Sequence, residues 1–165
     1  MLKVNLTLKN SEKEDEAKIT ELCDIVFGPG RFAKTAFRLR EAYQGNGDFG
    51  FCIASGDNIV GSITFTPVKI NGKDGAYLLG PLAVHPRIAG QGCGINLIKQ
   101  GIIAARERAA KLVILVGDLS YYSRVGFVAA PEGHLNFPGP VDSRRILVSQ
   151  LEENALPAFQ GKIHV

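Results

Sequence analysis

Hydrophobic and polar residues alternate in the first of four short segments that are predicted to form β-strands, and the third of these segments is β-branched and aromatic in character. These segments are 2–8, 49–54, 59–65 and about 76–84. Turns rich in Gly, Asn and Asp separate the last three, and strands joined by such short turns are expected to be antiparallel. The pattern therefore predicts an N-terminal strand and a β-meander in the middle of the chain.

In three other segments, hydrophobic residues recur at steps of three and four, as in amphipathic helices. These segments are 11–27, 31–42 and 95–110. The first opens with Ser11-Glu12-Lys13-Glu14, which has the spacing of a capping box, and Gly28-Pro29-Gly30 follows its end. In the second, Phe32 and Phe37 are predicted to lie on one side, with Arg38 and Arg40 on the other.

Residues 76–116 are predicted to form a strand, a glycine-rich loop, a helix and a second strand. The second strand, 112–116, is wholly apolar, as expected for a strand buried on both faces. A right-handed crossover of this kind makes the two strands parallel. A helical turn near 120–124, a strand from about Phe127, a Pro- and Gly-rich loop at 131–140 and a strand at 145–151 follow, and the tail from Pro157 shows no clear pattern. The elements indicate one α+β domain over 1–165.

Composition supports a single packed domain. The chain has 165 residues, of which 45% are hydrophobic and 21% charged, and this balance excludes a disordered chain. The net charge of +3 favours small anionic ligands slightly and gives little support to nucleic-acid binding. The 19 glycines exceed the usual share of about 7% and need an explanation.

The cysteines and histidines exclude several other classes. Cys23, Cys52 and Cys93 are widely spaced with no CxxC pair, so neither a disulfide framework nor a zinc knuckle fits. His134 and His164 have no partner at metal-binding spacing, and no metal is expected. No segment resembles a signal peptide, and no apolar run approaches the roughly 20 residues that cross a bilayer. The expectation is a cytoplasmic protein that contacts neither membrane nor nucleic acid.

Candidate chemistry is concentrated in the loop before the 95–110 helix. Glycine occupies every second position there, at Gly90, Gly92 and Gly94. Alternating glycines let the backbone approach a ligand closely, and the following helix adds unpaired N–H groups and the positive end of its dipole. The loop is therefore predicted to bind phosphate. It has neither the GK[ST] ending of a P-loop nor the GxGxxG spacing of a dinucleotide fingerprint.

Two segments resemble a known family. GPLAVHPRIAGQGCGINLI at 80–98 is similar to the acetyl-CoA binding motif of the GCN5-related N-acetyltransferases (GNAT), and YYSRVGF at 121–127 resembles that family's Y-x-x-x-G-F segment. With Gly117-Asp118 before the tyrosines, the chain resembles the YhbS-like branch in particular. The resemblance implies a GNAT-like α+β fold, in which a mixed, mostly antiparallel sheet is flanked by helices and a central parallel strand pair splays apart at the cofactor cleft.

The resemblance also implies which residues bind the coenzyme. The backbone amides from Gly90 through Gln91, Gly92, Cys93 and Gly94 to Ile95 are expected to bind its pyrophosphate. The backbone of Leu82, Ala83 and Val84 is expected to pair with its pantetheine arm. Ala89 stands where the family usually has Arg or Gln, and Arg87 is the candidate for supplying the missing charge.

Roles in catalysis follow from the same resemblance and from the chemistry of a thioester. The expected reaction is direct attack of a neutral amine on the acetyl carbonyl through a tetrahedral intermediate, with the backbone amide of Leu82 stabilising the oxyanion. Tyr122 stands where the family often has a general acid, and a phenol is protonated at neutral pH. Neighbouring tyrosines on a helix face different ways, so Tyr122 is preferred over Tyr121. Glu41, His85 and a water chain all remain candidates for the base.

The function predicted is an acetyl-CoA-dependent N-acetyltransferase whose partners are acetyl-CoA and an amine, either a small molecule or a protein. The alternative is a non-catalytic acyl-CoA-binding sensor or interaction module. The expected state is a monomer or a homodimer. Four arginines are expected to be solvated, although any that lined the acceptor cleft would favour an acidic substrate: Arg38, Arg40, Arg144 and Arg145.

Overall fold

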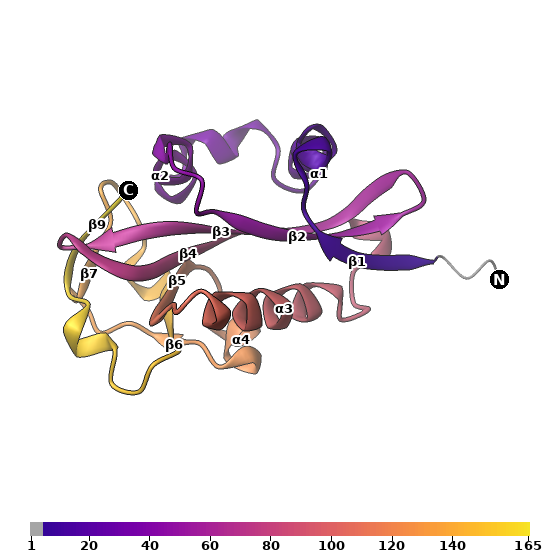
Figure 1. Cartoon of the computed structure of the whole chain (residues 1–165). Helices are drawn as coiled ribbons and strands as arrows, with labels where there is room; N and C mark the ends of the chain where they lie inside the picture. The colour runs from indigo at the N-terminus through magenta and orange to yellow at the C-terminus, as the bar shows by residue number, and fades with distance from the viewer. Residues whose placement is uncertain (1–4) are drawn as a thin grey trace.

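The predicted meander forms the centre of a mixed sheet in the computed structural model, which describes residues 5–165 (Figure 1). Within those residues the strand order is β1-β2-β3-β4-β5-β8-β6, and β9 pairs with β3 and β7. The strands are β1 (Leu6–Asn10), β2 (Phe49–Ser55), β3 (Asn58–Ile70), β4 (Lys73–Val84), β5 (Leu112–Val116), β6 (Val128–Ala129), β7 (Leu135–Asn136), β8 (Ile146–Gln150) and β9 (Gly161–His164). Residues 2–4 of the predicted first strand lie outside the described part.

Helices cover both faces of this sheet. They are α1 (Glu16–Phe27), α2 (Thr35–Ala42), α3 (Cys93–Glu107) and the short α4 (Leu119–Tyr122). Figure 1 shows α1 and α2 on one face, with α3 and α4 on the other. Leu97 and Ile98 of α3 belong to one buried cluster, whereas Leu39 of α2 and Leu22 of α1 belong to two others. Each face therefore has its own hydrophobic packing, and the predicted α+β fold class is confirmed.

Three predictions about local structure are wrong in detail. The capping contact lies at Asp15, whose carboxylate accepts a 2.9 Å hydrogen bond from Glu12 N–H, and Ser11 instead pairs its amide with Gly50 O. The predicted 31–42 helix is interrupted at Lys34, where extended backbone separates a 3-10 helix (Pro29–Ala33) from α2. The tail without a clear pattern contains β9, which pairs with β3 and β7.

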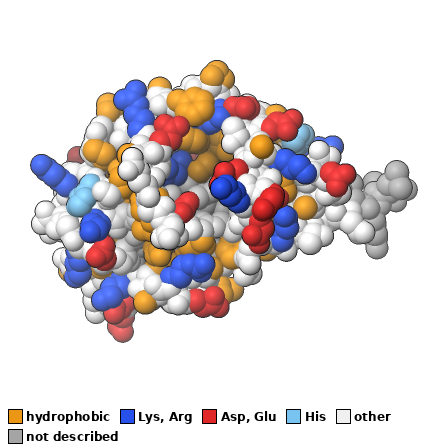
Figure 2. All heavy atoms as spheres, turned by 45° about the horizontal axis from the view of Figure 1, so that its top comes forward, with side chains coloured by type: hydrophobic (Ala, Val, Ile, Leu, Met, Phe, Trp, Pro, Cys, Tyr) orange, Lys and Arg blue, Asp and Glu red, His pale blue; other side chains and the backbone are white. Residues whose placement is uncertain are grey.

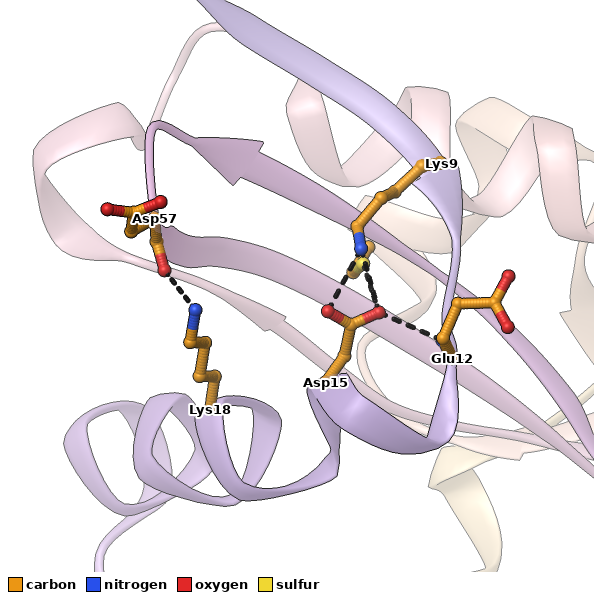
Figure 3. A network of polar contacts seen from close by, with 6 residues as sticks. Lys9, Glu12, Asp15, Lys18 and Asp57 are labelled. Atoms are coloured by element: carbon orange, nitrogen blue, oxygen red, sulfur yellow. Dashed lines mark hydrogen bonds and ion pairs between the residues drawn. The ribbon is translucent and has the colours of Figure 1, made fainter.

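The start of α1 is tied to β1 by a cluster of polar contacts (Figure 3). Lys9 Nζ lies 2.9 Å from both carboxylate oxygens of Asp15. The hydrogen bonds to this carboxylate hold the pKa of Asp15 below its ordinary value, with the amide of Glu12 contributing most and Lys9 next. Farther along α1, Lys18 Nζ donates to the backbone carbonyl of Asp57 in the β2–β3 turn. These contacts fix α1 over its face of the sheet.

The parallel strands β4 and β5 remain paired over only part of their length. Their register runs from Ala76↔Leu112 to Leu78↔Ile114 and then stops. Beyond that point β4 continues to Val84 against β3, with an irregular register next to Gly80, while β5 continues against β8. A bulge of this kind bends a strand. The predicted splaying of the central parallel pair is therefore confirmed, and it opens the sheet between α2 and α4.

Candidate active site

The open edge of β4 presents backbone groups that β5 no longer covers. His85 N–H donates to Val60 O at 2.8 Å, and the register pairs Ala83 with Ser62. Hydrogen-bonded and non-hydrogen-bonded pairs alternate along an antiparallel ladder, so the backbone groups of Ala83 face β3. Those of Leu82 and Val84 face the opposite side, where β5 has moved away. Of the three predicted pantetheine contacts, two thus offer free backbone groups at this edge.

The glycine loop lies at the C-terminal end of β4 and leads into α3. Gly90 and Gly92 adopt left-handed backbone conformations, with φ of +77° and +78°, and a Cβ on either would meet no atom within 4 Å. The first hydrogen bond of α3 runs from Asn96 N–H to Gly92 O, so the amides of the three preceding residues start the helix without a helical partner. An open backbone and free amides are what an anion requires.

The side chains of the predicted pyrophosphate loop differ in their exposure to solvent. Arg87, Ala89 and Gln91 are exposed. Cys93 is 7% exposed and belongs to the hydrophobic cluster beneath α3. Because Arg87 is exposed and flanks the loop, it remains the candidate for the charge that Ala89 does not supply.

A cavity of about 580 Å³ occupies the gap between the splayed strands. Its wall combines the β4 bulge and open edge, the end of β5, α2, α4 and the loop around 140–145. Figure 2, which turns the α1 and α2 face toward the viewer, shows hydrophobic side chains gathered around a hollow, with charged side chains scattered about it. A second cavity of about 350 Å³ lies between α1, α2 and the 43–48 loop, and Arg40, Phe37 and Pro81 line both cavities.

Both tyrosines of α4 line the first cavity. Their rings meet edge to face, with centroids 5.0 Å apart. The two rings nevertheless contact different surfaces, because the ring of Tyr122 lies against Gly117 at the end of β5. The hydroxyl of Tyr121 lies against Gly94 at the start of α3 and connects the cavity to the glycine loop. Burial, with smaller contributions from Tyr121 and Asp118, raises the pKa of Tyr122 to about 12.

Most charged groups near the cavity are paired. Arg145 Nη2 lies 3.4 Å from Asp118, and Arg144 binds Asp142 through two side-chain hydrogen bonds. Arg40 differs, because its Nε and Nη1 are buried without any hydrogen-bond partner in the described part of the chain. Its expected position on a solvated helix face is therefore wrong. Phe37 and Arg40 are three residues apart within α2, so they share a helix face and do not lie on opposite sides as predicted.

Two of the candidate bases lie apart from the cavity that holds Tyr122. Glu41 lines the second cavity, on the α1 side of Arg40. His85 lines neither, and its Nδ1 accepts a 3.2 Å hydrogen bond from Arg87 N–H. No cluster of three or more metal-ligating side chains occurs among residues 5–165. Across the same residues, none of the helices has the length and apolar character that spanning a bilayer demands.

The fold and this site define the class of protein. The family model described as the Acetyltransferase (GNAT) family matches residues 17–127, so the chain belongs to this family. It is similar to the "Uncharacterized N-acetyltransferase YhbS" of Escherichia coli K12, at 30% identity over 106 residues that make up 64% of each chain. It is also similar to the "Uncharacterized N-acetyltransferase YjhQ" of the same organism, at 29% identity over 82% of this chain and 76% of the relative. The match thus spans about two thirds of the length of YhbS.

Solved structures give the same fold. The crystal structure of Escherichia coli YhbS in complex with CoA superposes with a TM-score of 0.82 at 26% identity, over 98% of this chain and 89% of the other. A GNAT family acetyltransferase from Brucella melitensis, in complex with acetyl-CoA, superposes with a TM-score of 0.65 at 25% identity, over 90% and 97%. The YhbS-like resemblance seen in the sequence is thereby confirmed.

Proposed function

We propose that residues 1–165 form a single acetyl-CoA-dependent N-acetyltransferase domain, which transfers the acetyl group directly to a primary amine. One observation carries this proposal: the open β4 edge lines a cavity together with Tyr121 and Tyr122, and Tyr121 lies against Gly94 at the start of α3. The similar structures that hold CoA and acetyl-CoA support the choice of co-substrate. We also propose a cytoplasmic location, because the three cysteines are free thiols.

The backbone fits the two ends of the coenzyme. The amides of Cys93, Gly94 and Ile95, with those of the loop from Gly90, would donate to the pyrophosphate, and the helix dipole adds to the attraction. The carbonyl of Leu82 and the backbone groups of Val84 would bond the pantetheine arm as an added strand does. Ala83, whose backbone groups face β3, would contribute by holding this edge in place. None of these contacts needs a particular side chain, so Ala89 is tolerated.

The bound co-substrate supplies an acetyl thioester. In the transfer, the amine nitrogen attacks the carbonyl carbon and forms the C–N bond of a tetrahedral intermediate. The intermediate then collapses as the C–S bond breaks and the thiolate leaves, and the proton of the amine passes to a base. The amide of Leu82 faces the gap and would donate to the carbonyl oxygen as negative charge develops there. A donor fixed in the backbone needs little reorganisation during the reaction, which is why we assign this role to Leu82.

Tyr122 would donate a hydrogen bond to the leaving sulfur. Because burial keeps its pKa near 12, the phenol retains its proton throughout the neutral range. A group this weakly acidic stabilises a thiolate by donating a hydrogen bond and transfers its proton poorly. We therefore refine the predicted general acid to a hydrogen-bond donor. Because neither Glu41 nor His85 lines the cavity that holds Tyr122, the amine proton would leave through a water chain.

The proposal is tested by two measurements on the full chain. Calorimetric titration with acetyl-CoA reports binding, and a thiol-release assay across a panel of amines reports transfer. We expect saturable binding and amine-dependent thiol release. Binding without release on any amine would favour the acyl-CoA sensor instead, and absence of binding would reject both functions.

A further inference from the structure

Arg40 is a buried cation without a partner, at the junction of the two cavities. Its Nε and Nη1 make no hydrogen bond within residues 5–165, and none of the ion pairs found there includes it. The ring of Phe37, 4.7 Å from Cζ, gives a partial cation–π contact only. A buried guanidinium in this state is costly, because the water it has lost is not replaced by acceptors.

Arg31, a second buried arginine, has polar partners. Arg31, which is 3% exposed, forms an ion pair with Asp24 at 2.6 Å and donates to Gly28 O at 2.8 Å. The cationic group of Arg145, across the first cavity, is paired with Asp118. Arg40 is thus the cavity arginine that keeps its donors free, and burial lowers its pKa to about 10, which is consistent with missing acceptors.

The position of the guanidinium connects it to the reaction proposed above. A Cβ built on Gly80 would stand 2.8 Å from Arg40 Nη2 and 3.9 Å from Leu82 N. The two nitrogens therefore both lie within 4 Å of one point beside the β4 bulge and are at most 6.7 Å apart. A group bound by Arg40 would be a near neighbour of the carbonyl oxygen bound by Leu82. Tyr122 and Arg40 also affect each other's pKa, which places both at this gap.

We propose that Arg40 binds a carboxylate that one of the two substrates presents next to the reacting carbonyl. A planar, singly charged carboxylate matches a fork of the guanidinium and would accept from Nη2 together with either Nε or Nη1, the two atoms without partners. The acceptor would then be an amino-acid-like amine, with only a few bonds between its nitrogen and its carboxylate. The other possible source is the acyl group of a dicarboxylic acyl-CoA. This inference rests on the proposed transferase function.

The test compares substrates that differ only in the carboxylate. In one arm, acetyl-CoA is offered with amino acids and with their carboxamides; in the other, an amine without a carboxylate is offered with succinyl-CoA and with acetyl-CoA. We expect the carboxylate-bearing member of one arm to have a kcat/KM at least about tenfold higher. Arg40→Gln should abolish that ratio, Arg40→Lys should restore part of it, and Arg38→Gln, which alters an exposed arginine of the same helix, should leave it unchanged.

A binding measurement makes the result independent of turnover. Calorimetric titration of the CoA-loaded chain with N-acetylglycine should give saturable heat that N-acetylglycinamide does not give and that Arg40→Gln removes. Equal rates within both arms, with active transfer, would overturn the carboxylate site and leave the transferase function standing. If no amine is acetylated, the transferase function fails, and equal heats from the two N-acetyl compounds would overturn the carboxylate site as well.

Discussion

The ring of Tyr122 lies directly against Gly117, at the end of β5. A Cβ added to Gly117 would stand 2.6 Å from Tyr122 Cε2 and 3.0 Å from Leu115 Cδ1. A Cβ does not fit at such distances, so the ring of Tyr122 can take this position only because residue 117 is glycine. This contact, together with the edge contact to Tyr121, holds the phenol at the gap between β4 and β5.

Gly117→Ala is expected to displace the Tyr122 ring and lower kcat, while acetyl-CoA affinity changes little, because the glycine loop is untouched. Steady-state kinetics with varied acetyl-CoA separate the two effects. Unchanged kcat in a variant that folds would show that the position of the ring does not matter.

Tyr122→Phe removes the proposed hydrogen bond to sulfur and keeps the ring packing. We expect kcat to fall by about 10² with KM for acetyl-CoA nearly constant. Tyr121→Phe is the matched control, since it changes the neighbouring phenol in the same cavity. A loss shared equally by both variants would contradict a specific role for Tyr122.

The raised pKa of Tyr122 predicts how kcat depends on pH. The phenol donates only when protonated, and a pKa raised to about 12 preserves its proton until the solution is strongly alkaline. The profile of kcat against pH should therefore rise as the amine loses its proton and show no fall below about pH 11. A descending limb between about pH 8 and 10 that Tyr122→Phe removes would contradict this protonation state.

Gly92→Ala tests the backbone cradle. Its left-handed conformation costs an L-residue about 1–2 kcal/mol, so the loop should distort and the Kd for acetyl-CoA should rise about tenfold. Gly56→Ala is the control: Gly56 has φ of +59°, equally open surroundings, and a place in the distant β2–β3 turn. Both variants should lose similar stability, and only Gly92→Ala should lose affinity in calorimetry.

The stability of the fold at acid pH is expected to depend on the charge of Asp15. Hydrogen bonds from the Glu12 amide and from Lys9 hold the pKa of Asp15 below its ordinary value of 3.8 in the folded chain. The charged carboxylate therefore stabilises the fold above that pH, and this stability is lost as pH falls through the folded-state pKa. Asp15→Asn should lower the melting temperature at pH 7 and flatten its decline toward pH 2. Parallel melting curves for both proteins across this range would refute the contribution.

Arg40→Met should fold and be more stable than the natural chain, by on the order of 1 kcal/mol in urea unfolding, because an uncompensated buried cation is replaced by an apolar side chain of similar length. A marked loss of stability would mean that Arg40 supports the fold instead of a ligand.

The elements that the sequence predicts best are those with strong local patterns. The wholly apolar 112–116 segment forms β5 with the predicted bounds, and the alternating glycines before Cys93 form the predicted strand-to-helix loop. Both signals depend on neighbouring residues only, so periodicity and spacing are sufficient to read them.

Features set by distant contacts could not be predicted in this way. β9 pairs with β3 across almost a hundred residues of chain, and a four-residue strand has little pattern of its own. The burial of Arg40 depends on the approach of α2 to the β4 bulge. The tyrosines of α4 are placed by contacts with Gly94 of α3 and with Gly117 after β5. The acceptor side of the site is built from such contacts, whereas the coenzyme side is built from local motifs.

The most direct test of the central claim follows the acetyl group itself. The chain is mixed with acetyl-CoA labelled with ¹³C in the acetyl group and with a panel of primary amines, and mass spectrometry measures labelled product while a thiol reagent measures released CoA. We predict labelled N-acetyl amine and free CoA in equal amounts, with slower formation in Tyr122→Phe. Saturable acetyl-CoA binding with no labelled amine from any acceptor would contradict the transferase function.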